Sequence, residues 1–236
     1  MLYVFSAAMS AIILTAGATG GWAKDQIPFE VAKMIFEFNF TDNDLGVQVS
    51  LNGDPWKEVK IVGPDRSKIF EVKIGGSLKR FGFTELFSES NEPELDEVPF
   101  KDILALFPEG EYKFFGKTVE GEKLVGTAML THAIPDGPSM LLAQVMNGDL
   151  VISWVAPPAV SSLTGLPIDI VAYQVIVERA DNDQLGAAPR IFDIKLPATE
   201  TSVTVPPQFL ESREEYEFEV LAIEIGGNQT ISSSSF

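Results

Sequence analysis

The sequence predicts an all-β protein built from two tandem β-sandwiches with one short helix. Three observations favour this fold class. Apolar and polar residues alternate with a period of two along most of the chain, turn-forming residues separate these runs, and the one convincing helical spacing covers residues 100–107. The apolar share of 45% in 236 residues is enough for folded cores, and the length fits one or two domains.

The first 23 residues have the pattern of a signal peptide. Residues 2–23 carry no charged side chain, and the apolar stretch at 4–16 is too short for a membrane span. Gly21 and Ala23 are small residues at the positions that a signal peptidase reads, which predicts cleavage before Lys24. No Lys or Arg precedes the apolar stretch, so an uncleaved anchor is the alternative. We therefore expect a secreted or periplasmic protein with no membrane contact beyond this segment.

Composition excludes several classes of function. The chain has no Cys and a single His, which argues against disulfides, zinc sites and thiol nucleophiles, and a cysteine-free exported protein is more usual in bacteria. The net charge of -17 falls entirely after the leader. Because such a surface repels nucleic acid and anionic lipid, we expect neither as a partner.

Strands and one helix can be placed from residue spacing. Three runs alternate apolar and polar residues between turns, as half-buried strands do: residues 36–40, 47–51 and 70–74. Four apolar residues lie at the i, i+3, i+4, i+7 spacing of one helix face: Phe100, Ile103, Leu104 and Phe107. Pro108 then ends the helix, because it cannot donate the next hydrogen bond.

A domain boundary is expected where turn formers concentrate, in Ala-Ile-Pro-Asp-Gly-Pro at residues 133–138. This predicts a signal peptide at 1–23, a first domain at 24–135 and a second domain at 136–236. Few contacts need cross such a junction. We therefore expect the two domains to melt separately.

An internal repeat spans that boundary. The pattern Leu-x5-Tyr-x-Phe occurs twice, about one domain length apart, as Leu106, Tyr112 and Phe114 and again as Leu210, Tyr216 and Phe218. This spacing predicts a tyrosine corner, in which the Tyr hydroxyl bonds to a backbone group a few residues earlier. The Leu is expected to seal the preceding loop onto the core.

Residues 139–236 carry further features in a fixed order: Leu150–Trp154 followed by Pro157-Pro158, Ile170–Val175, Ser202–Val205, Leu210 and Tyr216–Val220. With these features the segment resembles a fibronectin type III domain. The resemblance implies that Trp154 and Tyr173 are core residues of facing sheets and that Tyr216 is the corner. It implies no activity, because this fold presents many unrelated functions on its loops. The first domain more loosely resembles the immunoglobulin-like modules of bacterial exported proteins.

Two weak binding sites can be proposed in the first domain. Asp42 and Asp44 have the Asp-x-Asp spacing that calcium sites use, although we favour the alternative of an ordinary Asx-rich turn. Trp56 follows the turn at residues 52–55. Its indole either stacks on a sugar ring or a partner's side chain, or is buried at the start of a strand.

The residues that could support catalysis are few. Five carboxylates crowd the segment 87–97: Glu89, Glu92, Glu94, Asp96 and Glu97. Glycoside hydrolysis would need two of them fixed in a walled cleft. An ordinary solvated loop explains the same acidic residues without such a cleft. His132 is expected to be a half-buried residue at a strand end rather than a general base. We therefore expect a non-enzymatic exported binding or spacer protein with a protein or glycan partner and no cofactor apart from the calcium candidate; the alternative is a small extracellular hydrolase that uses carboxylates of segment 87–97.

Overall fold

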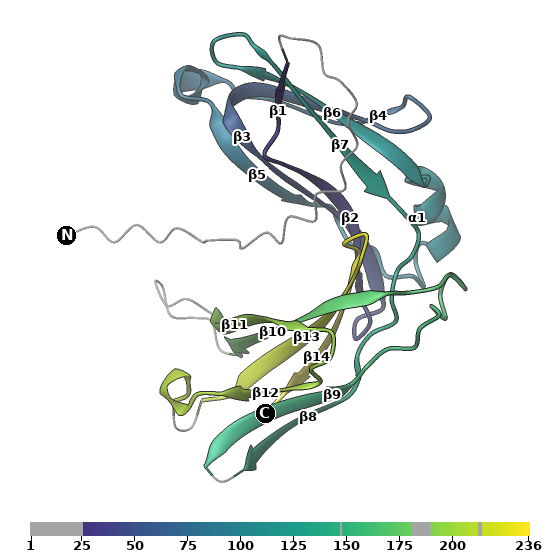
Figure 1. The fold of residues 1–236 in the computed structure, drawn as a ribbon, viewed down its shortest axis with the longest axis vertical. Helices are drawn as coiled ribbons and strands as arrows, with labels where there is room; N and C mark the ends of the chain where they lie inside the picture. Colours follow the sequence, from purple (N-terminus) through teal and green to yellow (C-terminus); the bar gives the residue numbers. More distant parts are fainter. Residues whose placement is uncertain (1–25, 147, 181–189, 212–213) are drawn as a thin grey trace, which may run out of the picture.

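The computed structural model describes residues 26–146, 148–180, 190–211 and 214–236. The predicted signal peptide and its cleavage point lie outside the described residues. The prediction of an all-β fold with one short helix is confirmed (Figure 1). None of the helices in the described part of the chain is long and apolar enough to cross a membrane.

The first unit is organised by one long strand, β3 (Asp44–Val62). Its first half pairs with β2 and β5, and its second half pairs with β4 and β6, so the sheet bends around β3 into an open, sandwich-like arrangement. The remaining elements are β1 (Gln26–Pro28), β2 (Val31–Asn39), β4 (Lys68–Lys73), the 3-10 helix η1 (Gly76–Arg80), β5 (Phe83–Glu89), α1 (Phe100–Leu106), β6 (Gly110–Thr118) and β7 (Lys123–Leu130).

Helix α1 covers one side of the first core. Ile103 is buried, and Phe100, Leu104 and Phe107 pack partly buried against the same core, as the predicted helix face requires. The expectation that Leu106 seals the core is wrong, because this side chain is 68% exposed. At 100° per residue Leu106 points away from the face that Ile103 and Leu104 present, so the helix itself turns it to solvent.

The second unit is a sandwich of three strands facing four. The three-stranded sheet has the order β12-β9-β8, and the larger sheet contributes β11, β10, β13 and β14. Trp154 and Tyr173 meet edge to face between the two sheets, with ring centroids 5.2 Å apart. The elements are β8 (Ser139–Met146), β9 (Asp149–Val155), β10 (Ile170–Arg179), β11 (Arg190–Pro197), β12 (Ser202–Val205), the 3-10 helix η2 (Pro207–Phe209), β13 (Tyr216–Glu224) and β14 (Gln229–Ser235).

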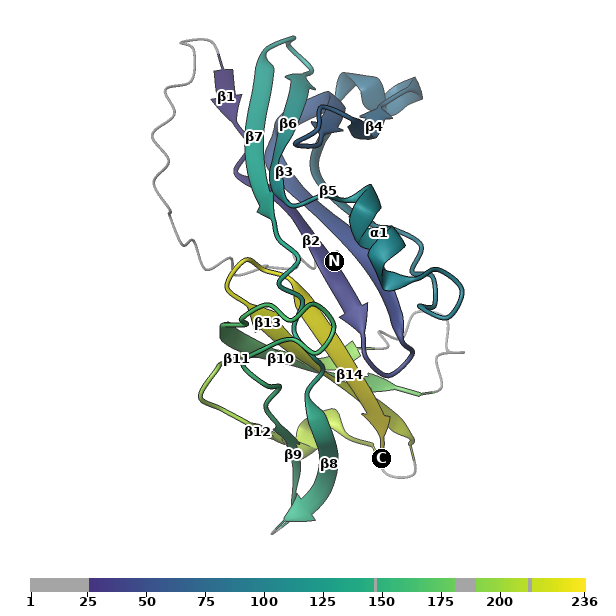
Figure 2. The ribbon, with the colours of Figure 1, turned by 90° about the vertical axis from the view of Figure 1, so that its right-hand side faces the viewer.

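The two units share a continuous sheet. The last strand of the chain, β14, pairs in parallel with β2 of the first unit, with Gln229, Thr230 and Ile231 opposite Glu37, Phe38 and Asn39. The strand order therefore runs β1-β7-β6-β3-β2-β14-β13-β10-β11 through both units. Figures 1 and 2 show β14 lying beside β2 where the units meet. We call this paired region, residues 37–39 with 229–231, the seam.

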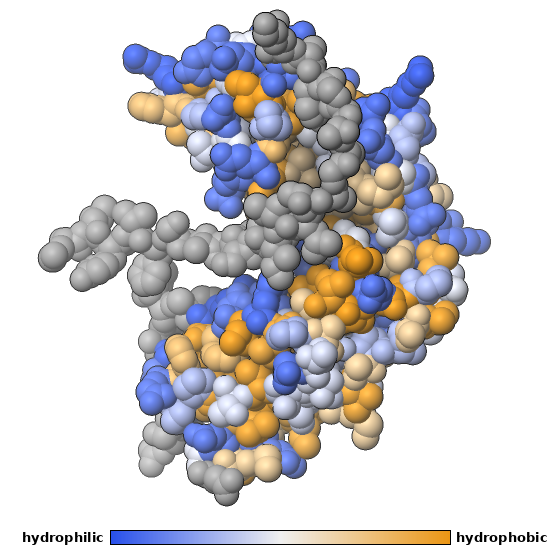
Figure 3. Space-filling model, in the orientation of Figure 1, coloured by the Kyte–Doolittle hydropathy of each residue, from blue (hydrophilic) through white to orange (hydrophobic). Residues whose placement is uncertain are grey.

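The seam contradicts the expectation that few contacts cross the junction. The connecting segment 131–138 packs against the rest of the protein, since Ile134, Pro135, Gly137 and Pro138 are buried. Figure 3 shows apolar side chains gathered at the level where the two units meet. Turn-forming residues end β7 and start β8, but they do not make this junction a free linker.

Candidate functional site at the seam

The turn between β13 and β14 presents Asn228 to the first unit. The carboxylate of Glu224 accepts hydrogen bonds from the backbone N–H groups of Gly226, at 2.7 Å, and Asn228, at 3.0 Å. Gly227 has a φ of 100°, a conformation that residues with a side chain rarely adopt. This short turn is therefore fixed by a buried carboxylate and a glycine before it contacts the other unit.

Asn228 is 2% exposed and bonds across the seam. Its Oδ1 accepts from the Phe36 N–H of β2 at 2.9 Å. Its Nδ2 donates to the carbonyl oxygens of Thr131, at 2.9 Å, and Ala133, at 3.1 Å. One side chain of the second unit thus ties together strand β2 and the segment that connects the units.

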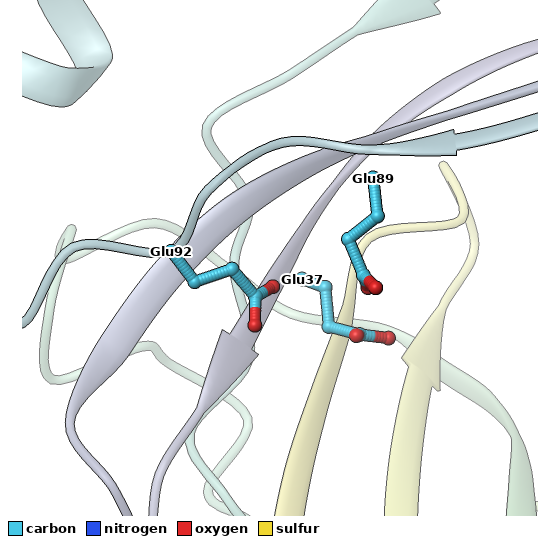
Figure 4. Close-up of side chains that lie close together, drawn as sticks. All are labelled: Glu37, Glu89 and Glu92. Carbon is cyan, nitrogen blue, oxygen red and sulfur yellow. The ribbon is translucent and has the colours of Figure 1, made fainter.

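Three glutamates meet beside the seam. One carboxylate oxygen each of Glu37, Glu89 and Glu92 lies within 4.8 Å of the other two. Glu37 comes from β2, Glu89 from the end of β5, and Glu92 from the loop that follows (Figure 4). We call these three residues the glutamate cluster.

Two glutamine amides contact the cluster. The Nε2 of Gln229, on β14, donates to Glu37 Oε2 and also to Gln48 Oε1 at 3.4 Å. Gln48 in turn donates from Nε2 to Glu89 Oε1 at 2.8 Å. The first of these bonds crosses the seam, so the second unit contributes directly to the cluster.

Burial and like charge alter the acidity of the cluster. Burial raises the pKa of Glu37 to about 7, with Glu89 adding repulsion and the Gln229 hydrogen bond opposing the shift. Burial also raises the pKa of Glu92 to about 7, reinforced by the charges of Glu89 and Glu37. Among the ion pairs of the described residues, none involves a member of the cluster. Glu37 and Glu92 therefore change protonation state near neutral pH.

Gly46 makes room for Glu92. A Cβ atom at position 46 would lie 2.6 Å from both the Cγ and the Oε1 of Glu92. The backbone of β3 is regular here, so glycine is needed for the close approach of this side chain. Because position 46 has no side chain, Glu92 and the loop after β5 can lie directly over β3.

The chemistry open to the cluster is proton exchange or the binding of a hard cation, for which carboxylates are suitable ligands. A hydrolase would in addition need a walled cleft. Two shallow, open depressions on the described surface are lined by β4 and by residues of 62–66 together with β6. Neither contains a residue of the cluster.

The proposed calcium ligands lie in the hairpin between β2 and β3. Asp42 Oδ2 accepts a hydrogen bond from Asn39 Nδ2 at 2.8 Å. Burial raises the pKa of Asp44, with further repulsion from Asp42 and Glu94. Neither aspartate belongs to a group of three metal-ligating side chains within the described residues. Calcium binding at this turn stays a prediction.

Trp56 does not form a binding surface. Its side chain is 0% exposed, and its ring meets Phe83 edge to face with centroids 5.5 Å apart. The hypothesis of an exposed stacking indole is wrong. The indole packs in the first core, just after a register shift in the β3–β5 pairing between Asn52 and Trp56.

The two tyrosines of the repeat both bond to backbone groups upstream. Tyr112 Oη donates to the Pro108 carbonyl oxygen at 3.0 Å, and Tyr216 Oη accepts from the Glu211 N–H at 2.7 Å. Leu210 packs partly buried against the second core. The two repeats therefore share the tyrosine bond and differ at the leucine.

The other candidates have structural surroundings. Of the acidic segment, Glu89 and Glu92 join the cluster, Glu94 forms a backbone bridge with Asp44, and Asp96 and Glu97 are exposed. His132 is half-buried, and its Nε2 lies 2.9 Å from the Phe107 carbonyl oxygen. This histidine is placed at a strand end, outside the cluster.

Sequence reasoning missed Glu37, Gln229 and Asn228. Glu37 alternates with Phe36 and Phe38, and period two assigns such a residue to solvent. It is 6% exposed because a strand from the far end of the chain pairs with β2. The sequence feature that could have indicated this site is Gly46, since a glycine within a strand often marks the close approach of another group.

The comparisons with known proteins add little. No family model matches the chain, and neither does any curated protein. Among solved structures, a two-domain fibronectin type III segment of chicken tenascin covers 88% of this chain and 98% of its own length, at 12% identity and a TM-score of 0.35. The spore cortex lytic enzyme SleM of Clostridium perfringens covers 43% of this chain and 28% of its own length, at 17% identity and a TM-score of 0.31. These are weak resemblances at the level of the fold.

Proposed function

We propose that this protein is an exported, non-enzymatic binding or spacer protein whose two sandwich units act as one unit toward a protein or glycan partner. The observation that carries the proposal is the seam, where β14 pairs with β2 and Asn228 bonds to both β2 and the connecting segment. A joint of this kind favours a fixed spacing between the units.

The proposal assigns the second unit to the fibronectin type III family. Its three-on-four strand order, the contact of Trp154 with Tyr173 and the bond of Tyr216 to Glu211 support this assignment. We also propose that the first unit is an immunoglobulin-like module. Sandwich folds of these kinds present many unrelated functions on their loops, so the assignment favours binding or spacing over any one chemistry.

Export is the second part of the proposal. The uncharged apolar leader and the absence of Cys favour a bacterial protein that is secreted or periplasmic. Mass spectrometry of the protein from its native host should find an N-terminus at or near Lys24. An intact Met1 on the mature protein would contradict cleavage and establish an anchor.

Rebinding to the producing cell tests the function. Purified, labelled protein is added to cells whose own gene has been deleted, and saturable retention on proteins or glycans of the cell surface is expected. The same fractions are assayed for newly formed reducing ends and peptide termini. Turnover that depends on Glu89 or Glu92, carboxylates of segment 87–97, would replace the binding proposal with the hydrolase alternative.

A further inference from the structure

We propose that the seam is a pH-sensitive joint, in which protonated Glu37 keeps β2 and β14 closely paired and ionisation of the glutamate cluster loosens the connection between the two units. This inference rests on the joint of the proposed function and adds its regulation. It does not depend on the identity of the partner.

The strand-paired part of the joint is short, so one buried side chain at its end affects the pairing. Only three residues of each strand are paired in the seam, and Glu37 lies directly opposite Gln229 at one end of it. The Gln229 amide also reaches Gln48, which bonds to Glu89. A movement of Glu37 therefore disturbs both the strand pairing and the amide bonds that link the units.

The charged groups around Glu37 are mainly acidic. Glu89 faces it from β5 and Glu219 from β13. Glu92 lies beside it from the loop after β5, and Asp44 on β3 faces Glu92. Lys33 on β2 is the cation that interacts with Glu37, and it is shared with Glu224 while Lys195 repels it.

Ionisation leaves the cluster with few donors. Glu37, Glu89 and Glu92 present only acceptors once all three are charged, and the amides of Gln229 and Gln48 donate to Glu37 and Glu89. Protonation of one carboxyl both removes a charge and creates a donor for a neighbour. The closed seam is therefore favoured when the cluster keeps a proton.

The pH range follows from the direction of the shift. In the closed seam the pKa of Glu37 is raised from 4.5 to about 7, so the closed form holds a proton that an open, hydrated form releases. The contribution of Glu37 to the preference for the closed seam is fully present below pH 4.5 and is lost as the pH rises through about 7. Since each pKa unit is tenfold in the equilibrium, the loss is at most about 300-fold for this carboxyl.

A distance measurement across the seam tests the joint. The chain has no Cys, so spin labels can be placed uniquely by the exposed substitutions Ser77→Cys in the first unit and Thr199→Cys in the second. Pulsed dipolar spectroscopy at pH 5.5 should give one narrow distance distribution. At pH 8.5 the distribution should broaden, with a midpoint near pH 7.

Matched variants identify the cluster as the cause. Glu37→Gln imitates the protonated acid and should stay narrow at both pH values. Glu89 is exposed, so Glu89→Gln should not disturb folding. It removes one repelling charge and should therefore reduce the broadening. Glu85→Gln is an exposed carboxylate on the same strand as Glu89 and should behave like the unmodified protein.

The outcomes separate the two proposals. A distribution that is narrow at both pH values in the unmodified protein overturns the pH-sensitive joint and leaves the fixed spacing intact. A distribution that is broad at both overturns the fixed spacing as well. Broadening that persists equally in Glu37→Gln and Glu89→Gln also overturns the inference.

Discussion

Replacing Asn228 with alanine should uncouple the two units. The side chain accepts from the Phe36 N–H and donates to the Thr131 and Ala133 carbonyls, and all three bonds reach the first unit or the connecting segment. The turn that carries Asn228 is held separately by Glu224, which bonds to backbone N–H groups. Asn228→Ala should therefore leave the turn in place and remove the hydrogen bonds that this side chain makes to β2 and to the connecting segment.

The magnitude follows from the burial of the partners. Phe36 is fully buried, so its N–H is left without an acceptor, at a cost of about 1–3 kcal/mol. The two carbonyl oxygens each lose a donor, which costs less because a carbonyl is more easily left under-satisfied. We expect a total loss of about 3 kcal/mol in the free energy of unfolding.

Calorimetry and hydrogen exchange measure the two consequences. The unmodified protein should unfold in one transition whose calorimetric and van't Hoff enthalpies agree, whereas Asn228→Ala should show two. Exchange of backbone amides should rise in β2 and β14 before it rises elsewhere. Asn91→Ala, an exposed residue of the loop after β5, is the control and should change stability by less than about 0.5 kcal/mol.

Two results would refute this reasoning. One is a loss of stability in Asn228→Ala no larger than in Asn91→Ala. The other is two separate transitions in the unmodified protein, which would mean that the strand pairing does not couple the units even with Asn228 in place.

Further predictions concern stability. Tyr216→Phe and Tyr112→Phe should each cost about 1–3 kcal/mol in urea unfolding, because each deletes a hydroxyl bonded to the backbone; a neutral result in either would remove the corner from that unit. Gly46→Ala should displace Glu92, seen as a fall in the pKa of Glu92 toward 4.5 by carboxyl NMR, and an unchanged pKa would contradict the close packing. Stability should fall between pH 4.5 and about 7, by up to about 3 kcal/mol from Glu37, since the folded form holds the proton more tightly than the unfolded form; Glu37→Gln should flatten this slope. Millimolar calcium, added to chelator-treated protein, should raise the melting temperature no more than sodium chloride of equal ionic strength; a calcium-specific rise would contradict this expectation and show that the folded protein binds the ion.

Local patterns predicted much of the fold. Alternation places Phe36 and Phe38 in the first core, and the spacing of Ile103 and Leu104 predicts a helix that α1 provides. Such patterns work because side chains alternate across a strand and recur every three or four residues on a helix, whatever the rest of the chain does. The expectation that Leu106 is buried came from its match to Leu210 in the second unit. It failed because Leu106 lies in a helix, whose rotation turns this side chain to solvent.

By itself, the sequence determined that this protein is all-β, acidic, free of cysteine and divided by a turn-rich segment near residue 135. Only the tertiary structure decided that Glu37 is buried, that Asn228 reaches Phe36, and that the two units share a sheet. The physical reason is that parallel pairing of β2 with β14 joins segments from opposite ends of the described chain. Local periodicity specifies which face of a strand is apolar, but it carries no information about which distant strand will pair with its edge.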